Sequence, residues 1–488
     1  MDKVQDVLED ARRDLKLGRP EARRAAVKKL AALGTRESFE LVLEALADPD
    51  GQAGDEAQLA IGRVKDARLF ALVQGPLGLA SRDEWVKLRA FEACGRIEDG
   101  FDVRKMFGGV LSRDPELART ALWSIERQAR AKGLAADERD TGLRLDGFVR
   151  GSLPPEVRGA ALLALLSVDA FAAHDRALEA LSDSADALRC AGMLVVGTFS
   201  EQEAFTLSTR ALADTSDRVR TVAIANLERL KSRAAVLALI EQLGRESRSR
   251  LKCEIRRYLR ETSGLEYGDD LAAWRAWANT LKGPWSTGEA RASSPYRGDT
   301  HVKLAGFELT SDRVTFLIDM SGSMWNTDAG GRTRKELVDM KLRACLEALP
   351  ASSAFNVIPY TKTANAFEKR LVRATKENVG RAATWFEKRN ERGSGNVFDA
   401  ALLALEDPDV DTLVVLTDGV PTGGRRWNMD LMVELLVERN RFRQVAFDSL
   451  LVEAPKGNRR AWTELAARTG GRSLAIEAQE LIEKEAAR

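Results

Sequence analysis

Three oxygen-bearing side chains, Asp319, Ser321 and Ser323, stand at alternate positions directly after an apolar run. Gly322 gives the backbone freedom to curl there, so that one carboxylate and two hydroxyls can point at a single place. All of these donors are hard oxygens, which suit Mg²⁺, Mn²⁺ or Ca²⁺ rather than zinc or copper. The spacing therefore predicts a divalent-cation site. The alternative is that Asp319 only caps a helix while the serines bond the backbone.

A buried strand is expected to position these side chains. The residues before Asp319 read RVTFLI, a run rich in β-branched and aromatic types that is typical of a strand in a parallel sheet. A second apolar run, TLVVLT at residues 412–417, also ends in an acid, Asp418. In open α/β sheets a ligand site lies at the carboxyl ends of the strands, which is where both runs end.

The stretch RVTFLIDMSGSM resembles the DxSxS signature of the metal-ion-dependent adhesion site in von Willebrand factor type A (VWA) domains. The resemblance covers roughly residues 302–476. In that family the Asp and both Ser residues hold a divalent cation, usually Mg²⁺, together with a Thr from a second loop and an Asp from a third. The resemblance implies that Asp319, Ser321, Ser323 and Asp418 are metal ligands.

The second loop departs from the family pattern. Family members commonly read GGTN before a helix, whereas this chain reads Gly393, Ser394, Gly395, Asn396. Gly395 stands where the Thr is expected, and Ser394, one place earlier, offers a replacement hydroxyl. We therefore expect one weakly bound Mg²⁺ or Mn²⁺, with more of its shell left to water, which Mg²⁺ tolerates well.

Length and composition indicate a protein of two or more domains. The chain has 488 residues, and 75 Lys and Arg nearly balance 74 Asp and Glu, so no global field favours nucleic acid or an anionic membrane. No run reaches about 18 uninterrupted apolar residues, and the N-terminal sequence lacks the apolar core of a secretory signal. We predict a cytoplasmic protein with no nucleic-acid partner and no membrane insertion, and expect its four cysteines to be buried, reduced thiols.

The first 280 residues are helical in pattern, and they repeat. Arg158, Arg189 and Arg220 are each 31 residues apart, and each is followed three positions later by Ala or Gly. A unit of this length accommodates two helices with two turns, and it must stack on its neighbours to bury its apolar stripe. The units resemble the short HEAT-type α-solenoid repeats of bacterial proteins. The polar stretch 131–145 is expected to be an insertion.

The expected architecture is an α-solenoid of HEAT-like repeats at residues 1–280, a linker at 281–301 and a doubly wound α/β VWA domain at 302–488. Trp274 and Trp277 are expected to cap the last repeat or dock it against the next domain. The predicted helices are 334–349, 379–389, 398–405, 429–439 and 460–468. The predicted strands are 313–318, 355–360, 412–417, 445–452 and 473–476, with an edge strand somewhere in 361–376.

Catalytic patterns are scarce in this sequence. Its only histidines are His174 and His301, and neither a GxSxG elbow nor a GxxxxGK[ST] loop occurs. Phosphatase nucleophile loops resemble DxDxT, and Ser321 stands where the second acid would act. We therefore predict a non-enzymatic scaffold that binds partner proteins through the metal site and the solenoid surface. The alternative is a metal-dependent hydrolase or phosphatase using the same oxygens.

Residues just after the two ligand loops are predicted to contact the partner. Trp325 follows Ser323, and Arg425, Arg426 and Trp427 follow the Asp418 loop. Tryptophan and arginine are the types most enriched at binding hot spots. An acidic residue of the partner would complete the shell of the metal while the arginines pair with neighbouring acids. The alternative is that Trp325 folds under its loop into the core and that the arginines are simply solvated.

Overall fold

The computed structural model describes residues 2–98, 101–132, 138–282, 302–327 and 331–477. The chain divides into two compact units: unit 1 comprises Met1–Val196 and Arg425–Met432, and unit 2 comprises Gly197–Gly424 and Val433–Arg488. The predicted boundaries at residues 280 and 302 stay a proposal, and most of the predicted linker, residues 283–301, lies outside the described part. Within the described ranges, no helix is long and apolar enough to cross a membrane.

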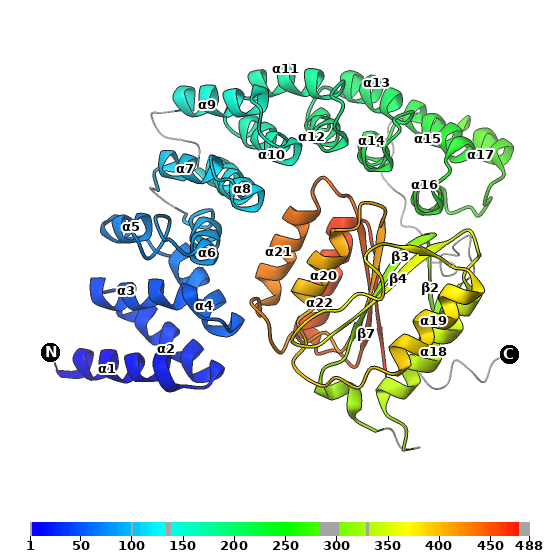
Figure 1. The fold of residues 1–488 in the computed structure, drawn as a ribbon. Helices are drawn as coiled ribbons and strands as arrows, with labels where there is room; N and C mark the ends of the chain where they lie inside the picture. The colour runs from blue at the N-terminus through cyan, green and yellow to red at the C-terminus, as the bar shows by residue number, and fades with distance from the viewer. Residues whose placement is uncertain (1, 99–100, 133–137, 283–301, 328–330, 478–488) are drawn as a thin grey trace. The chain divides into compact units, whose positions relative to one another are not determined.

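The part of unit 1 before residue 197 is built from helices where it is described, and Figure 1 draws it from blue to blue-green. They are α1 (Asp2–Leu17), α2 (Pro20–Leu33), α3 (Arg36–Glu44), α4 (Gly51–Gly62), α5 (Ala67–Gln74), α6 (Glu84–Cys94), α7 (Phe107–Val110), α8 (Pro115–Lys132), α9 (Glu138–Arg150), α10 (Pro155–Leu166), α11 (Ala170–Ala180) and α12 (Asp186–Val196), with the 3₁₀ turns η1 (Ala45–Ala47) and η2 (Val103–Met106). The even-numbered helices contact one another in chain order, from α2 to α12, and so form one continuous row.

The recurring arginines occupy equivalent positions in successive repeats. Arg158 and Arg189 lie in the first turn of α10 and α12, and each donates to a main-chain carbonyl of a preceding segment: Arg158 Nε to Val149 at 2.8 Å, and Arg189 Nη1 to Asp183 at 3.0 Å. The small residue of the repeat permits close approach, because a Cβ added at Gly192 would lie 3.0 Å from the carbonyl oxygen of Ala177. These positions serve the scaffold, as predicted.

Unit 2 begins with five helices: α13 (Glu201–Ala211), α14 (Asp217–Leu230), α15 (Arg233–Arg245), α16 (Ser249–Ser263) and α17 (Leu271–Ala278). The repeat continues here, because Arg220 donates from the first turn of α14 to the carbonyl of Asp214 at 2.9 Å. In α17 the buried Trp274 packs edge-on against Trp277 and Tyr267. The tryptophan pair thus closes the last helical repeat.

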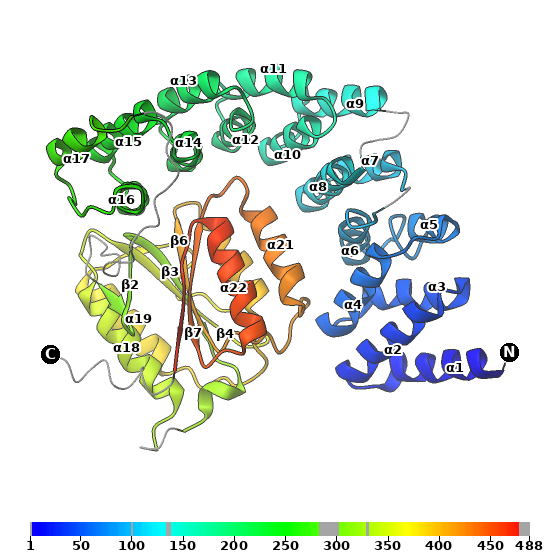
Figure 2. The ribbon, with the colours of Figure 1, turned by 180° about the vertical axis from the view of Figure 1, so that it is seen from behind.

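The rest of unit 2 is a six-stranded sheet with helices on both faces. The strands are β3 (Arg313–Asp319), β4 (Ala354–Tyr360), β5 (Val372–Arg373), β6 (Thr412–Thr417), β7 (Ala446–Val452) and β8 (Ser473–Ile476), and the helices are α18 (Arg334–Ala348), α19 (Lys376–Glu387), α20 (Val397–Leu405), α21 (Met429–Asn440) and α22 (Lys456–Thr469). The order is β5-β4-β3-β6-β7-β8, and only β5 is antiparallel. Helices α18 and α19 cover one face, and α20 and α22 the other (Figures 1 and 2).

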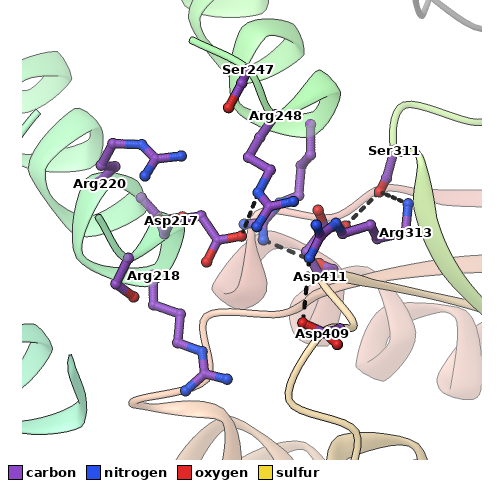
Figure 3. A network of polar contacts seen from close by, with 12 residues as sticks. Asp217, Arg218, Arg220, Ser247, Arg248, Ser311, Arg313, Asp409 and Asp411 are labelled. Carbon is purple, nitrogen blue, oxygen red and sulfur yellow. Dashed lines mark hydrogen bonds and ion pairs between the residues drawn. The ribbon is translucent and has the colours of Figure 1, made fainter. Parts of the chain in front are cut away.

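Polar contacts join the helices of unit 2 to the start of β6 (Figure 3). Arg250 of α16 donates to the main-chain carbonyl oxygens of Asp411, at 3.1 Å, and of Gln444. Arg218 of α14 donates to the carbonyl oxygen of Pro408 at 2.9 Å. Main-chain carbonyls at a strand start are thereby satisfied by buried or half-buried cations, which explains why helices and sheet belong to one unit.

The predicted fold class is confirmed, with local differences. The stretch 131–145 is not a simple insertion, since α9 begins at Glu138 and packs on α10; residues 133–137 lie outside the described part. Helices α19 and α22 begin three or four residues earlier than predicted, at Lys376 and Lys456. A short hairpin of β1 (Lys303–Leu304) and β2 (Phe307–Glu308) went unpredicted, because two-residue strands carry no periodicity.

Candidate metal site

The carboxyl ends of β3 and β6 bring the two predicted acids together. The strands are parallel neighbours with Ile318 opposite Leu416, so the next residues, Asp319 and Thr417, end at the same edge. β3 is apolar because both of its faces are covered; Val314, Phe316 and Ile318 belong to the core on one of them. The chain then passes Ser321 and enters the 3₁₀ segment η3 (Gly322–Trp325), which contains Ser323.

Asp319 is buried, with only 1% of its surface exposed, and it accepts hydrogen bonds from two neutral groups. The Ser321 amide donates to Oδ1 at 2.8 Å, and the Thr417 hydroxyl donates to Oδ2 at 2.7 Å. Burial raises the pKa of Asp319 to about 6, and the nearby charge of Asp418 adds to the rise against these hydrogen bonds. The carboxylate is therefore held in place while its charge stays poorly compensated.

The remaining predicted ligands form a chain of short contacts from Asp319. Ser321 Oγ lies 3.1 Å from Ser323 Oγ, and the Ser323 hydroxyl donates to Asp418 Oδ2 at 2.5 Å. The Asp418 Oδ1 atom accepts from the Val420 amide at 3.1 Å, which fixes the carboxylate at the start of its loop. Two carboxylates and two hydroxyls from separate loops thus converge at the end of the sheet.

The second loop also reaches this site, but with Gly395 rather than with Ser394. A Cβ added at Gly395 would lie 3.4 Å from Asp319 Oδ1 and 3.6 Å from Ser321 Cβ, so this backbone borders the carboxylate directly. The Ser394 hydroxyl instead lies against Gly423, where an added Cβ would be 2.3 Å from it. Thr422 ties the loops together, since its hydroxyl accepts from the Gly395 amide at 2.6 Å.

The donor set fits a hard divalent cation. Asp319, Ser321, Ser323 and Asp418 supply only oxygen, and the two carboxylates are linked through serine hydroxyls that a metal would engage instead. No cluster of three or more His, Cys, Asp or Glu side chains with metal-binding geometry occurs in the described ranges. A metal here would therefore take hydroxyl and water ligands for much of its shell.

Trp325 lies half-buried beside the site. Its ring packs against the core, its indole N–H donates to the Met320 carbonyl at 3.4 Å, and the guanidinium of Arg392 lies 4.3 Å from the ring centroid. The indole is thus partly under its own loop, as in the alternative interpretation, while one face remains in contact with an exposed arginine. Its predicted role in partner binding stays a prediction.

The other predicted partner-binding residues belong to unit 1. Arg426 is only 1% exposed, so it is not a solvated arginine; its Nη2 donates to Glu92 Oε2 at 2.6 Å. Trp427 is half-buried under Arg24, whose guanidinium lies 4.5 Å from the ring centroid, whereas Arg425 is exposed. These three residues therefore contact helices of unit 1, and a partner would reach Arg426 only after that contact opens.

Sequence reasoning missed three functional contributors. Thr417 orients Asp319 by donating a hydrogen bond to it. Its position at the end of the neighbouring parallel strand could have indicated this contact from the sequence. Thr422 accepts from the Gly395 amide and so holds the second loop. In the sequence, its place four residues after Asp418 was the feature that could have pointed to this role. Glu92 pairs with Arg426 although the two are 334 residues apart in the sequence. No sequence pattern predicted this pair.

The C-terminal part of the chain is a VWA-type domain by its sheet topology and sequence similarity, and a large helical region precedes it.

Parts of the chain are similar to known proteins. The chain is 34% identical over 126 residues to mouse inter alpha-trypsin inhibitor heavy chain 4, covering 23% of this chain and 13% of that protein. It is 32% identical over 123 residues to human inter-alpha-trypsin inhibitor heavy chain H2, covering 23% and 12%. The chain thus spans about an eighth of the length of these curated relatives.

A von Willebrand factor type A structure from Catenulispora acidiphila aligns at a TM-score of 0.30, with 17% identity over 35% of this chain and 40% of that one. No protein-family model matches the chain.

Proposed function

We propose that the chain is a non-enzymatic interaction protein that captures a partner protein at a Mg²⁺ or Mn²⁺ ion on the VWA domain. The observation that carries this proposal is the buried, poorly compensated Asp319 beside Asp418, bordered by serine hydroxyls at the end of the sheet. Asp319, Ser321, Ser323 and Asp418 would hold the ion, and Thr417 would keep the Asp319 carboxylate oriented. When bound, the ion supplies a positive centre that accepts an oxygen ligand from outside the chain.

The chemistry of the partner follows from the donor set. Gly395 contributes no side chain, so positions in the shell are left for water or for an acidic residue of the partner. A carboxylate of the partner both neutralises the ion and fixes the orientation of docking. Trp325, beside the loop, would contact the partner, and the surface of the helical repeats offers a further binding face. The predicted cytoplasmic location remains a prediction.

Metal binding and capture test this proposal together. Mn²⁺ titration by calorimetry should show one weak site in the wild type that is lost in Asp319→Ala and in Asp418→Ala. Affinity capture from lysate should then yield a partner that elutes with chelator and is absent with either variant. Equal Mn²⁺ binding by the wild type and both variants would contradict the metal assignment.

The hydrolase or phosphatase alternative makes a different prediction. It requires turnover of ester or phosphate-ester substrates that depends on added Mg²⁺ or Mn²⁺ and disappears in Asp319→Ala. We expect wild type and Asp319→Ala to be equally inactive in such a screen. Metal-dependent turnover by the wild type alone would replace the interaction function with an enzymatic one.

A further inference from the structure

A short stretch of the chain enters unit 1 directly after the Asp418 loop. Residues up to Gly424 belong to unit 2, Arg425–Met432 belong to unit 1, and the chain returns to unit 2 at Val433 within α21. Gly424 has a φ of +96°, a conformation that favours glycine, and marks where the chain changes direction. We call residues 425–428 the latch segment.

The latch segment is recognised first through the side chain of Arg426. Its Nη2 donates to Glu92 Oε2 and its Nη1 to Gln58 Oε1, both at 2.6 Å, and Gln58 also donates to Glu92 at 2.9 Å. Trp85 stacks over the same guanidinium, 4.7 Å from the ring centroid. The planar fork of arginine matches this arrangement, which a lysine ammonium cannot reproduce.

The main chain of the latch segment is recognised as well. The amides of Trp427 and Asn428 both donate to Asp55 Oδ2, at 2.7 and 2.9 Å. Arg89 donates to the carbonyl oxygen of Arg425. Because a buried carboxylate and a buried guanidinium each bind backbone groups, the site selects a peptide segment with an arginine at one position rather than a free arginine side chain.

Helix α4 is shaped for this approach. A Cβ added at Gly51 would lie 2.7 Å from both the Arg426 carbonyl carbon and the Trp427 amide nitrogen. Those are backbone atoms, which cannot turn aside as a flexible side chain would. Glycine weakens a helix, so its presence in the first turn of α4 is explained by the close passage of the latch segment.

We propose that residues 425–428 are a releasable latch in a receptor site formed by Gly51, Asp55, Gln58, Trp85, Arg89 and Glu92, and that the docked latch withholds Arg426 and Trp427 from partners. The contact is reversible because it consists mainly of charged and polar groups that water can satisfy once the site opens. Burying such pairs contributes little net stability relative to the hydrated ions. The predicted partner role of Arg426 and Trp427 rests on the proposed function, whereas docking itself does not.

Hydrogen exchange at two amides measures docking directly. In the wild type the Trp427 and Asn428 amides should be protected, because Asp55 binds both. Gly51→Ala should speed their exchange by roughly tenfold or more while favouring the α4 helix itself. The matched control is Gly147→Ala, another helical glycine of unit 1, where an added Cβ meets nothing within 4 Å. Equal exchange in the wild type and Gly51→Ala would overturn the latch.

A peptide in trans tests whether the receptor site acts independently of α4 stability. A labelled peptide with the sequence GGRRWNMD, residues 423–430, should bind the double variant Arg426→Ala, Trp427→Ala, whose own latch is disabled. Binding to the wild type should be weaker by roughly tenfold or more, because the site is already occupied. Equal binding to both proteins, or binding to neither, contradicts a releasable latch.

The same variants separate this inference from the proposed function. Mn²⁺ titration of Gly51→Ala reports on the metal site, while exchange and peptide binding report on the latch. Loss of Mn²⁺ binding in Asp319→Ala with unchanged amide protection would support both assignments. Absence of metal binding in the wild type would end the metal proposal and leave the latch intact, whereas unprotected amides in the wild type would end the latch alone.

Discussion

Two groups of buried acidic side chains in this protein, one in each unit, are compensated in opposite ways. In unit 1, Asp55 and Glu92 lie among Arg89 and Arg426, so the cluster contains two acids and two bases. In unit 2, Asp319 accepts from the Ser321 amide and the Thr417 hydroxyl, which carry no charge. The first set is balanced within the chain, whereas the second keeps a negative charge that an external cation can neutralise.

This contrast gives a physical criterion for a metal site. Burial, with repulsion from Asp418, raises the pKa of Asp319 to about 6, and burial with repulsion from Arg426 lowers the pKa of Arg89 to about 10. A buried acid with cationic partners indicates structure, since the pair needs no ligand. A buried acid with neutral donors and a second acid beside it indicates a place for a cation.

Removing the charge of Glu92 should have the largest effect on stability. Glu92→Gln keeps the shape of the side chain but removes the nearer carboxylate of Arg426, at 2.6 Å, and leaves only Asp55 at 3.5 Å. Breaking a buried pair on one side costs about 3–5 kcal/mol. Urea unfolding should therefore show a loss of this size for unit 1 and no change in Mn²⁺ affinity.

A control for Glu92→Gln is available in the same unit. Arg12 and Glu37 form an ion pair in which both side chains are more than two-fifths exposed. Glu37→Gln should change stability by about 0–1 kcal/mol, because exposed pairs contribute little. Equal losses for the two variants would mean that the Arg426 contact is weak and that the acids of unit 1 are not balanced by it.

Another buried acid of unit 2, Asp411, tests whether neutral donors alone define a metal site. Its carboxylate accepts from the Ser311 and Thr412 hydroxyls, while Arg250 donates to its main-chain oxygen (Figure 3). Burial raises the pKa of Asp411 to about 6, although the charge of Arg250 opposes the rise. It has the neutral donors of Asp319 but lies at the start of β6, away from the ligand loops.

The sign of the pH dependence follows from this raised pKa. Protonated Asp411 favours the folded state, so its contribution to the free energy of unfolding is fully present below pH about 4 and is lost as the pH rises through about 6. A shift of this size corresponds to about 3 kcal/mol. The difference in stability between the wild type and Asp411→Asn should therefore grow between pH 4 and 7 in favour of the variant. A pH-independent difference, or a change in Mn²⁺ affinity, contradicts the assignment.

The succession of strands along the chain and the two acids at the candidate metal site were predictable because each rests on a local pattern. RVTFLID and TLVVLTD are apolar runs that end in an acid, and the structure places both ends at one edge of the sheet. The balance of unit 1 was not predictable. Arg426 looked exposed in a loop after two glycines, and its partners in α4 and α6 are separated from it by more than 330 residues.

Neutralising Asp319 should stabilise the metal-free protein, opposite in sign to Glu92→Gln. At pH 8 the charged Asp319 costs folding about 3 kcal/mol, and Asp319→Asn removes that charge at the expense of about 1 kcal/mol of hydrogen bonding. Unfolding in chelator should therefore show a gain of about 2 kcal/mol. With Mn²⁺ in excess the wild type should recover the difference, since only it gains stability from the ion. A loss of stability in chelator would show that Asp319 is compensated within the chain.

The smallest expected effect concerns the loop that departs from the VWA pattern. Gly395 borders Asp319, and an added Cβ there would lie at 3.4 and 3.5 Å from its two carboxylate oxygens, which is ordinary contact. Gly395→Thr should therefore fit and bring a hydroxyl to the metal, replacing a water. One further hydroxyl ligand should tighten Mn²⁺ binding by about tenfold, equivalent to about 1.4 kcal/mol.

The control is Gly395→Val, which has nearly the same shape and no hydroxyl, and should bind Mn²⁺ no more tightly than the wild type. Equal gains in both variants would assign the effect to loop rigidity, and no gain in Gly395→Thr would mean that the ion does not face this loop. Because Glu92 and Arg426 are balanced without a ligand, their region should not respond to Mn²⁺ in either variant. Of the two groups of buried acids, we expect the one at the end of the sheet to respond to the ion and the one in unit 1 not to respond.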